Sequence, residues 1–142
     1  MADYSITAAD VKPATSGYEE VTGEWKSDAS ITAGDILYLK TSATKIVAKA
    51  DSNDTASTAV ILGMAMNSCS SGQRVTIGKG NILVGSIGSL ADPIVILSTT
   101  AGKVAPYGDL GTSQRVVIAG WFVAANEVKI SPLSIGVTTP AP

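Results

Sequence analysis

Apolar and polar residues alternate along most of the chain, which is the pattern of β-strands with one face toward a core. In "DILYLK", Ile36 and Tyr38 point to one face while Leu37 and Leu39 point to the other. Clusters of Gly, Ser, Thr, Asn and Asp, which favour turns, separate such segments. "TKIVAKA" follows a polar turn, so it is expected to form a hairpin with "DILYLK". Further strands are expected in "QRVTIGKG", "NILVGSI", "PIVILST", "GKVAPY", "RVVIAGWFV" and "NEVKIS".

The period of an amphipathic helix is missing from the sequence. No window of about fifteen residues repeats apolar positions every three to four residues. At most one or two short helical turns are expected, near "SNDTAST", where Asp54 could cap the first turn, and near "DLGTSQR". The fold class predicted is therefore all-β, as a compact sandwich or small barrel.

Two apolar segments, "VILGMAM" and "VVIAGWFVAA", carry the same pattern of apolar residues around a central glycine. Gly63 and Gly120 are 57 residues apart (120 − 63), and Asp35 and Asp92 share that spacing. The repeat predicts two matched β halves, at about 31–80 and 88–131, that form one body. In each half the glycine is expected to mark a bulge or a close approach between sheets.

The flanks differ from this β domain, which is placed at 29–131. Residues 1–28 are polar and are expected to form an extended N-terminal segment. Residues 132–142 are rich in Pro and Thr. Because proline removes a main-chain donor, this tail is expected to run extended over the surface rather than join a central strand.

Composition and charge exclude several classes of function. The net charge is −2, and the ten Lys and Arg residues are scattered, so no basic stripe is present to bind nucleic acid. The longest apolar run is about half of the roughly 20 residues that a membrane-spanning helix requires. Cys69 is the only cysteine, which suits a reducing cytoplasm. The N-terminus lacks the features of a signal peptide. We expect a soluble protein that binds neither nucleic acid nor membrane.

Catalytic chemistry finds little support in the sequence. The chain has no histidine, which removes Ser-His-Asp and Cys-His pairs and the commonest ligand of transition metals. Cys69 has no base near it in sequence. Glu19 and Glu20 are adjacent, so they would face opposite sides of a strand. Asp51 and Asp54 lack the glycine and the distal glutamate of a calcium loop. We predict no enzymatic activity, no cofactor and no metal site.

The glycine-rich segment "GKGNILVG" is not a nucleotide-binding loop. It lacks the Gly-Lys-Ser/Thr ending and a following helix. Gly78 and Gly80 are instead expected to shape a bulge or a tight bend between strands.

Two aromatic residues outside the alternating pattern are candidate interface anchors. Tyr18 and Trp25 lie in the polar stretch "TSGYEEVTGEWKSD", and an exposed tryptophan is a common interface residue. The alternative for Trp25, which is favoured, is that it packs the N-terminal segment onto its own domain. By contrast, Trp121 and Phe122 are consecutive in a strand, so one is expected to face inward and the other outward.

The order of these segments resembles the small capsid cement, or head decoration, proteins of tailed bacteriophages. The resemblance spans roughly residues 28 to 131. In that family an Ala-Gly-Asp/Gln introduces an apolar-Tyr-apolar strand, a Gly-Lys-apolar turn recurs in the second half, and each half has a Gly-apolar strand. The matching residues are Ala33-Gly34-Asp35, Leu37-Tyr38-Leu39, Gly63, Gly72, Gly102-Lys103 and Gly120.

The resemblance implies a structural virion protein that is made in the host cytoplasm and lies on the capsid exterior. Such a protein binds the major capsid protein at capsomer junctions, often as a homotrimer, and stabilises the shell. We expect the capsid contact on the N-terminal segment with Tyr18 and Trp25. An alternative is a carbohydrate- or receptor-binding β module of a phage fibre or tail. An enzyme is the least favoured class.

Overall fold

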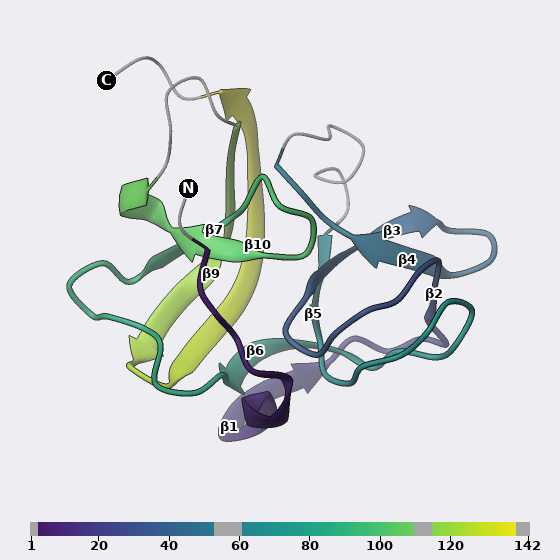
Figure 1. The fold of residues 1–142 in the computed structure, drawn as a ribbon, viewed down its shortest axis with the longest axis horizontal. Coiled ribbons are helices and arrows are strands. Elements are labelled where there is room, and N and C mark those ends of the chain that lie inside the picture. The colour runs from purple at the N-terminus through teal and green to yellow at the C-terminus, as the bar shows by residue number, and fades with distance from the viewer. Residues whose placement is uncertain (1–2, 53–60, 110–114, 139–142) are drawn as a thin grey trace.

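The structure, a computed structural model, describes residues 3–52, 61–109 and 115–138 (Figure 1). Within these ranges the all-β prediction is confirmed: ten strands form one mixed, open sheet, with two short 3-10 turns. The elements are η1 (Ala8–Asp10), β1 (Lys12–Glu20), β2 (Lys26–Ser27), β3 (Ile36–Thr41), β4 (Ile46–Lys49), β5 (Ile61–Ala65), β6 (Ile77–Leu83), β7 (Ile94–Leu97), β8 (Val104–Pro106), η3 (Tyr107–Asp109), β9 (Arg115–Ala124) and β10 (Glu127–Thr138).

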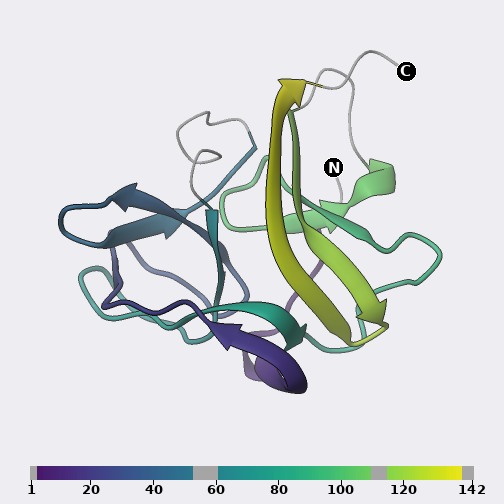
Figure 2. The same ribbon diagram turned by 180° about the vertical axis from the view of Figure 1, so that it is seen from behind.

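The strand order is β2-β4-β3-β5-β6-β10-β9-β7-β8, and β1 pairs with β6 outside this path. β2 runs parallel to β4, and the other pairs are antiparallel. The sheet is open, where the sequence predicted a sandwich or a barrel. It folds into two lobes that lie side by side (Figures 1 and 2): β2 to β5 form the first lobe, β7 to β10 form the second, and β6 with β1 joins them.

Strand order and register match between the two lobes. Going inward, the order is β4-β3-β5-β6 on one side and β8-β7-β9-β10 on the other. Leu37 lies opposite Gly63, and Val95 lies opposite Gly120. A register shift follows directly after each of these pairs. The prediction that each glycine marks a bulge is therefore confirmed.

The hairpin turns of the two lobes also match. Lys45 (φ 58°) and Gly102 (φ 80°) are both left-handed. Each lies two residues before a strand residue in the same pairing position, Val47 opposite Leu39 and Val104 opposite Leu97. Among the described residues Lys45 is the one non-glycine with positive φ, a conformation that costs an L-residue about 1–2 kcal/mol.

Two buried clusters form the core, one on each face of β3. Ile36 belongs to the larger cluster, against which Tyr38 packs, whereas Leu37 belongs to the smaller cluster, against which Leu39 packs. The predicted alternation of this strand is thus confirmed. The larger cluster draws on both lobes and contains Val11, Ala33, Ile36, Ala50, Met64, Ile82, Val84, Val95, Leu97, Val104, Val117, Ala119, Phe122, Val128 and Ile130. The smaller cluster contains Trp25, Ile31, Leu37, Val47, Ala65, Val75 and Ile77.

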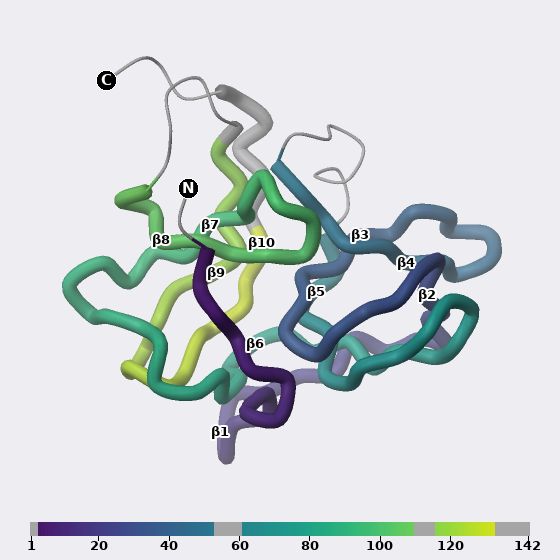
Figure 3. Tube along the Cα trace, in the orientation of Figure 1, coloured from purple at the N-terminus to yellow at the C-terminus, as the bar shows by residue number. Residues whose placement is uncertain are grey.

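The N-terminal segment is more structured than the sequence indicated. Residues 12–20 form β1, which pairs with β6 across a register shift between Pro13 and Tyr18. Before β1, the Tyr4 main-chain N–H donates to the Val104 carbonyl. The Tyr4 ring packs edge-on against the ring of Phe122, with the two ring centroids 5.4 Å apart. Figure 3 shows this segment running from the second lobe to the start of β1. The expectation of an extended segment outside the β domain is therefore wrong for these residues.

The C-terminal strand also extends beyond its predicted end. β10 continues to Thr138 and pairs with β9, for example Leu133 with Ile118. Residues 132–138 are therefore part of β10, which in this stretch pairs with β9 alone, and not a separate tail. Pro132 is tolerated because it lies in a register shift between Ile130 and Leu133, where the regular ladder is interrupted.

The two segments predicted to form short helical turns are described only at their ends, and η3 ends at Asp109, the first residue of "DLGTSQR". Most of "SNDTAST" and of "DLGTSQR" falls outside the described residues, whereas η1 precedes β1 and η3 follows β8. Gly78 and Gly80 lie within one strand, β6, rather than between two. Gly80 has a φ of 73°, so the bend predicted for this segment occurs inside the strand.

Candidate interaction surfaces

Trp25 is a core residue, with 7% of its surface exposed. Its indole Nε1–H donates to the Val21 carbonyl at 2.9 Å, and Lys45 Nζ lies 5.3 Å from the ring centroid. The expectation that Trp25 stands exposed as an anchor is wrong. The alternative, that Trp25 packs the N-terminal segment onto its own domain, is confirmed; the sequence did not show which distant strands supply its neighbours in the smaller cluster.

Tyr18 is half-buried and packs against the larger cluster. Its ring covers Gly78, where an added Cβ would lie 2.6 Å from Tyr18 Cε1. Burial raises the pKa of the Tyr18 phenol above its ordinary value of 10.0, and the charge of Glu20 raises it further. Tyr18 therefore holds β1 on β6 and offers only part of its ring to a partner.

The remaining side chains of β1 form an exposed, polar flank of the sheet. Lys12, Pro13, Glu19 and Glu20 are exposed. A register shift interrupts the strand after Pro13, and proline lacks a main-chain donor, so the free edge is a poor template for adding a long strand. A partner is more readily met by the side chains of this flank than by its main chain.

The large apolar side chains that stand exposed among the described residues all belong to the second lobe or the loop leading into it. They are Leu90, Tyr107, Trp121 and Val123. Trp121 is 36% exposed, whereas Phe122 is 4% exposed, so the prediction that one faces outward and the other inward is confirmed. Large apolar side chains that are exposed in one lobe make that lobe a candidate interaction surface.

Trp121 belongs to a row of residues that crosses four strands on one face of the sheet. The register places Trp121 opposite Ile94 of β7 and opposite Lys129 of β10, and Lys129 opposite Asn81 of β6. Residues directly opposite each other share a face. Lys129 Nζ lies 5.5 Å from the centroid of the Trp121 indole, a cation–π contact. Sequence reasoning missed this row because it depends on the register of separate strands.

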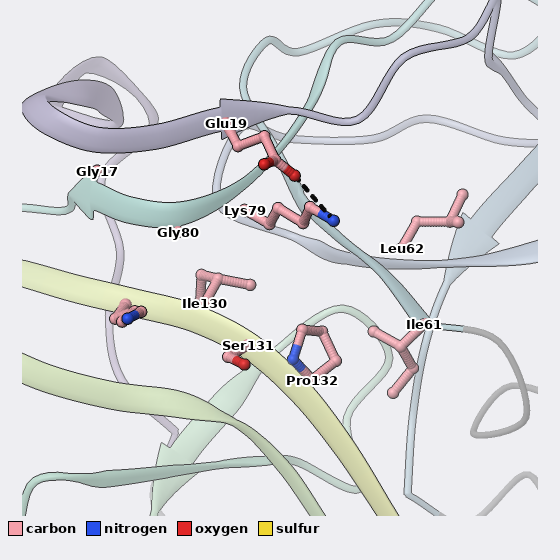
Figure 4. Close-up of a pocket in the computed structure, with 10 residues that line it drawn as sticks. Gly17, Glu19, Ile61, Leu62, Lys79, Gly80, Ile130, Ser131 and Pro132 are labelled. Atoms are coloured by element: carbon pink, nitrogen blue, oxygen red, sulfur yellow. Dashed lines mark ion pairs between the residues drawn. The ribbon is translucent and has the colours of Figure 1, made fainter.

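A groove of about 560 Å³ lies where β5 and β10 diverge from β6 (Figure 4). β5 pairs with β6 at Ile77 and Gly78, and β10 pairs with β6 from Gly80 onward. A salt bridge of 2.9 Å joins Lys79 to Glu19 at one side of the groove. The lining residues are Gly17, Glu19, Ile61, Leu62, Lys79, Gly80, Lys129, Ile130, Ser131 and Pro132.

The described residues contain no group of three or more His, Cys, Asp or Glu side chains that could hold a metal ion. Asp35 is the one buried carboxylate in the part of the chain that the structure describes. It accepts the Thr32 main-chain N–H at 2.9 Å, and Lys103 Nζ lies 3.7 Å away. The Thr32 bond is local, whereas the Lys103 contact ties the start of β3 to the turn of the opposite lobe. No helix in the described ranges is long and apolar enough to cross a membrane.

Comparison with known proteins yields no match to a protein-family model, to a curated protein or to a solved structure. Information on function therefore comes from the sequence pattern and from the surfaces of this fold.

Proposed function

We propose that the protein is a structural component of a phage virion that binds the major capsid protein on the outside of the assembled shell and stabilises it at capsomer junctions. The observation that supports this proposal is that the glycines shared with the cement proteins lie at bulges and turns of this fold. Gly63 and Gly120 lie at matched bulges, and Gly34, Gly72 and Gly102 adopt positive φ. The shared motif is thus a set of bends and turns, as expected for a protein that acts through its shape.

We also propose that the two lobes are pseudo-repeats of one β unit. Matched strand order, matched bulges at Gly63 and Gly120, and matched left-handed turns at Lys45 and Gly102 support this origin. Chance similarity between short strands accounts for one such agreement, but it does not account for all three in the same order.

The capsid contact is assigned to the exposed side chains of β1, with Tyr18 and Trp25 as its support. Lys12, Glu19 and Glu20 are the charged groups of this flank. Trp25 contributes indirectly, because its indole binds the Val21 carbonyl just after β1. A homotrimer would present three such flanks at once, so that a modest single contact gives firm binding.

Sedimentation with shells that lack the protein tests this proposal. Wild-type protein is expected to pellet with the shells, and Lys12→Glu is expected to weaken binding several-fold. Lys26→Glu is the matched control, because Lys26 is an exposed strand lysine in the first lobe. If the wild type stays in the supernatant, the capsid function is wrong. If Lys12→Glu binds like Lys26→Glu, only the assignment to β1 is wrong.

A second candidate function is a carbohydrate- or receptor-binding module of a phage fibre or tail. The observation that favours it is the exposed indole of Trp121, flanked by Lys129 and with Asn81 one strand further along. An aromatic ring beside hydrogen-bond donors is a suitable platform for a sugar. Retention on cell-wall glycans that is lost in Trp121→Ala would favour this function over the first.

A further inference from the structure

β6 leaves the edge of β5 part of the way along that strand. β5 pairs with β6 at Met64 and Ala65, and from Gly80 onward β6 pairs with β10. Both partners lie on the same edge of β6. At one end, the Thr76 carbonyl accepts from Met66 N–H, just after β5; at the other, Val84 N–H donates to the Asn126 carbonyl, just before β10. Thr76 and Val84 are an even number of residues apart, and main-chain groups at even spacing in a strand point to the same edge. β1 occupies the opposite edge, where Val21 N–H donates to the Ile77 carbonyl.

The departure of β6 leaves Ile61 with a partner on one side only, and Leu62 is the extra residue of the register shift between Gly63 and Ile61. β3 pairs with β5 on that side, through Tyr38 and Ile61. On the other side, no strand in the described part of the chain pairs with these two residues. The pairing of β6 changes from β5 to β10 at Gly80, which has a left-handed backbone. An unpaired edge of this kind can pair with an added strand over only one or two residues, because the register shift at Leu62 interrupts the regular ladder.

The wall across the groove comes from β10 and differs in chemistry. Ile130, Ser131 and Pro132 line it. Pro132 has no main-chain N–H, so this wall offers apolar contact more than hydrogen bonds. Figure 4 shows Ile61 and Pro132 facing each other across the groove. A strand entering here would bond to β5 and rest its side chains on β10.

The charge of the groove indicates which strand it favours. Lys79 and Lys129 face a single carboxylate, Glu19, so the lining carries one net positive charge on a protein of net charge −2. Lys79 is already paired with Glu19 at 2.9 Å. Lys129 contacts the Trp121 ring and is in no salt bridge with a described residue. Lys129 can therefore receive a carboxylate from a partner.

We propose that this groove binds an extended acidic segment of a partner protein by strand addition to β5. The segment places an apolar side chain between Ile61 and Pro132 and a carboxylate at Lys129, which alternation along a strand allows. The exposed edge is short, so a single site binds weakly. The inference does not depend on the capsid function, although a shell protein would be one source of such a segment.

Titration of the full-length ¹⁵N-labelled protein by NMR tests the inference. The probe is a short acetylated peptide of alternating valine and aspartate, at millimolar concentration. We expect the amide signals of Leu62, Gly80 and Ser131 to shift. The same peptide with N-methylated backbone amides should lose this response, since strand addition needs main-chain donors. Lys129→Glu should weaken binding of the acidic peptide roughly three- to tenfold. The matched control, Lys26→Glu, should bind like the wild type.

Several results would overturn the inference. These are an absence of shifts at the three amides, an equal response to the N-methylated peptide, and an equal response to a peptide with lysine in place of aspartate. Shifts of these amides with an oligosaccharide but not with the peptide would assign the groove to a different ligand. Because no shell is present in the sample, the outcome is independent of whether the protein binds capsids.

Discussion

Gly63 in β5 and Gly120 in β9 occupy equivalent places in the two lobes. Each faces a neighbouring strand so closely that an added Cβ would overlap a main-chain carbonyl oxygen, that of Gly78 for the first and that of Lys129 for the second. Each is also directly preceded by the extra residue of a register shift against the strand on its other side, Leu62 for the first and Ala119 for the second. The recurring glycine of the sequence is thus a steric requirement of a repeated arrangement.

Substitution of either glycine by alanine should destabilise the protein to a similar extent. The overlap is with main chain, which cannot move aside as a side chain would, so Gly63→Ala and Gly120→Ala should each cost about 2–3 kcal/mol. Urea unfolding measures the loss. Gly72→Ala is the control: it has open space around it, and its φ of 80° alone should cost about 1 kcal/mol. A wild-type midpoint for Gly63→Ala or Gly120→Ala would contradict the matched geometry.

The Lys45→Gly variant should be more stable to unfolding than the Lys45→Ala variant. Both substitutions remove the contact of Lys45 with Trp25, so their difference isolates the left-handed backbone at φ 58°. Lys45→Gly should exceed Lys45→Ala in free energy of unfolding by about 1 kcal/mol. Equal stability of the two variants would show that this turn is not left-handed in solution.

Substitution of the two tryptophans by alanine should destabilise the protein to very different extents. Trp25→Ala should cost about 3–5 kcal/mol, because it removes a buried side chain and leaves the smaller cluster with a cavity. Trp121→Ala should cost less, about 1 kcal/mol, because the indole is 36% exposed and loses mainly its cation–π contact with Lys129. Thermal or urea unfolding compares them. The burial assigned to Trp25 would be wrong if the two losses were alike.

Stability should fall at alkaline pH through the tyrosines. Burial, then the charges of Asp92 and Asp109, raises the pKa of Tyr4 above 10.0, and burial, then Glu20, raises that of Tyr18. The folded state therefore favours the neutral phenols. Their contribution is fully present below the unfolded pKa of about 10 and is lost as the pH rises through the higher folded pKa. Unfolding free energies measured from about pH 8 to 11 should decline less in Tyr18→Phe than in the wild type. An identical decline would contradict the raised pKa of Tyr18.

Features set by local alternation could be predicted from the sequence. Val75 and Ile77 are buried while Arg74 and Thr76 are exposed, as their alternation indicated. The hairpin of β3 and β4 forms as expected. In these segments the residues that point inward are apolar, so the local pattern carries the information.

Features set by long-range pairing could not be predicted. β1 is an edge strand whose exposed residues show no alternation, and Trp25 is buried by strands far away in sequence. The alignment of the two halves from the sequence was also displaced by one residue at the first strand of each half. The register matches Leu37 with Val95, so the counterpart of Asp35 is Pro93 rather than Asp92. A one-residue displacement between the halves cannot be detected without knowing which strand residues pair.

The candidate surfaces divide in the same way. The exposure of Trp121 followed from its place beside Phe122, but the row with Lys129 and Asn81 needed the register of β10 and β6. The groove needed both partners of β6 to be known. Sequence reasoning could name side chains but not the surfaces that they form together.

Electron cryo-microscopy of shells with and without the protein tests the central claim most directly. The capsid function predicts additional density on the outer surface, at the junctions between capsomers, in which the two-lobed sheet can be placed with β1 toward the shell. Density on the tail or fibres, or none on the shell at saturating protein, would contradict it.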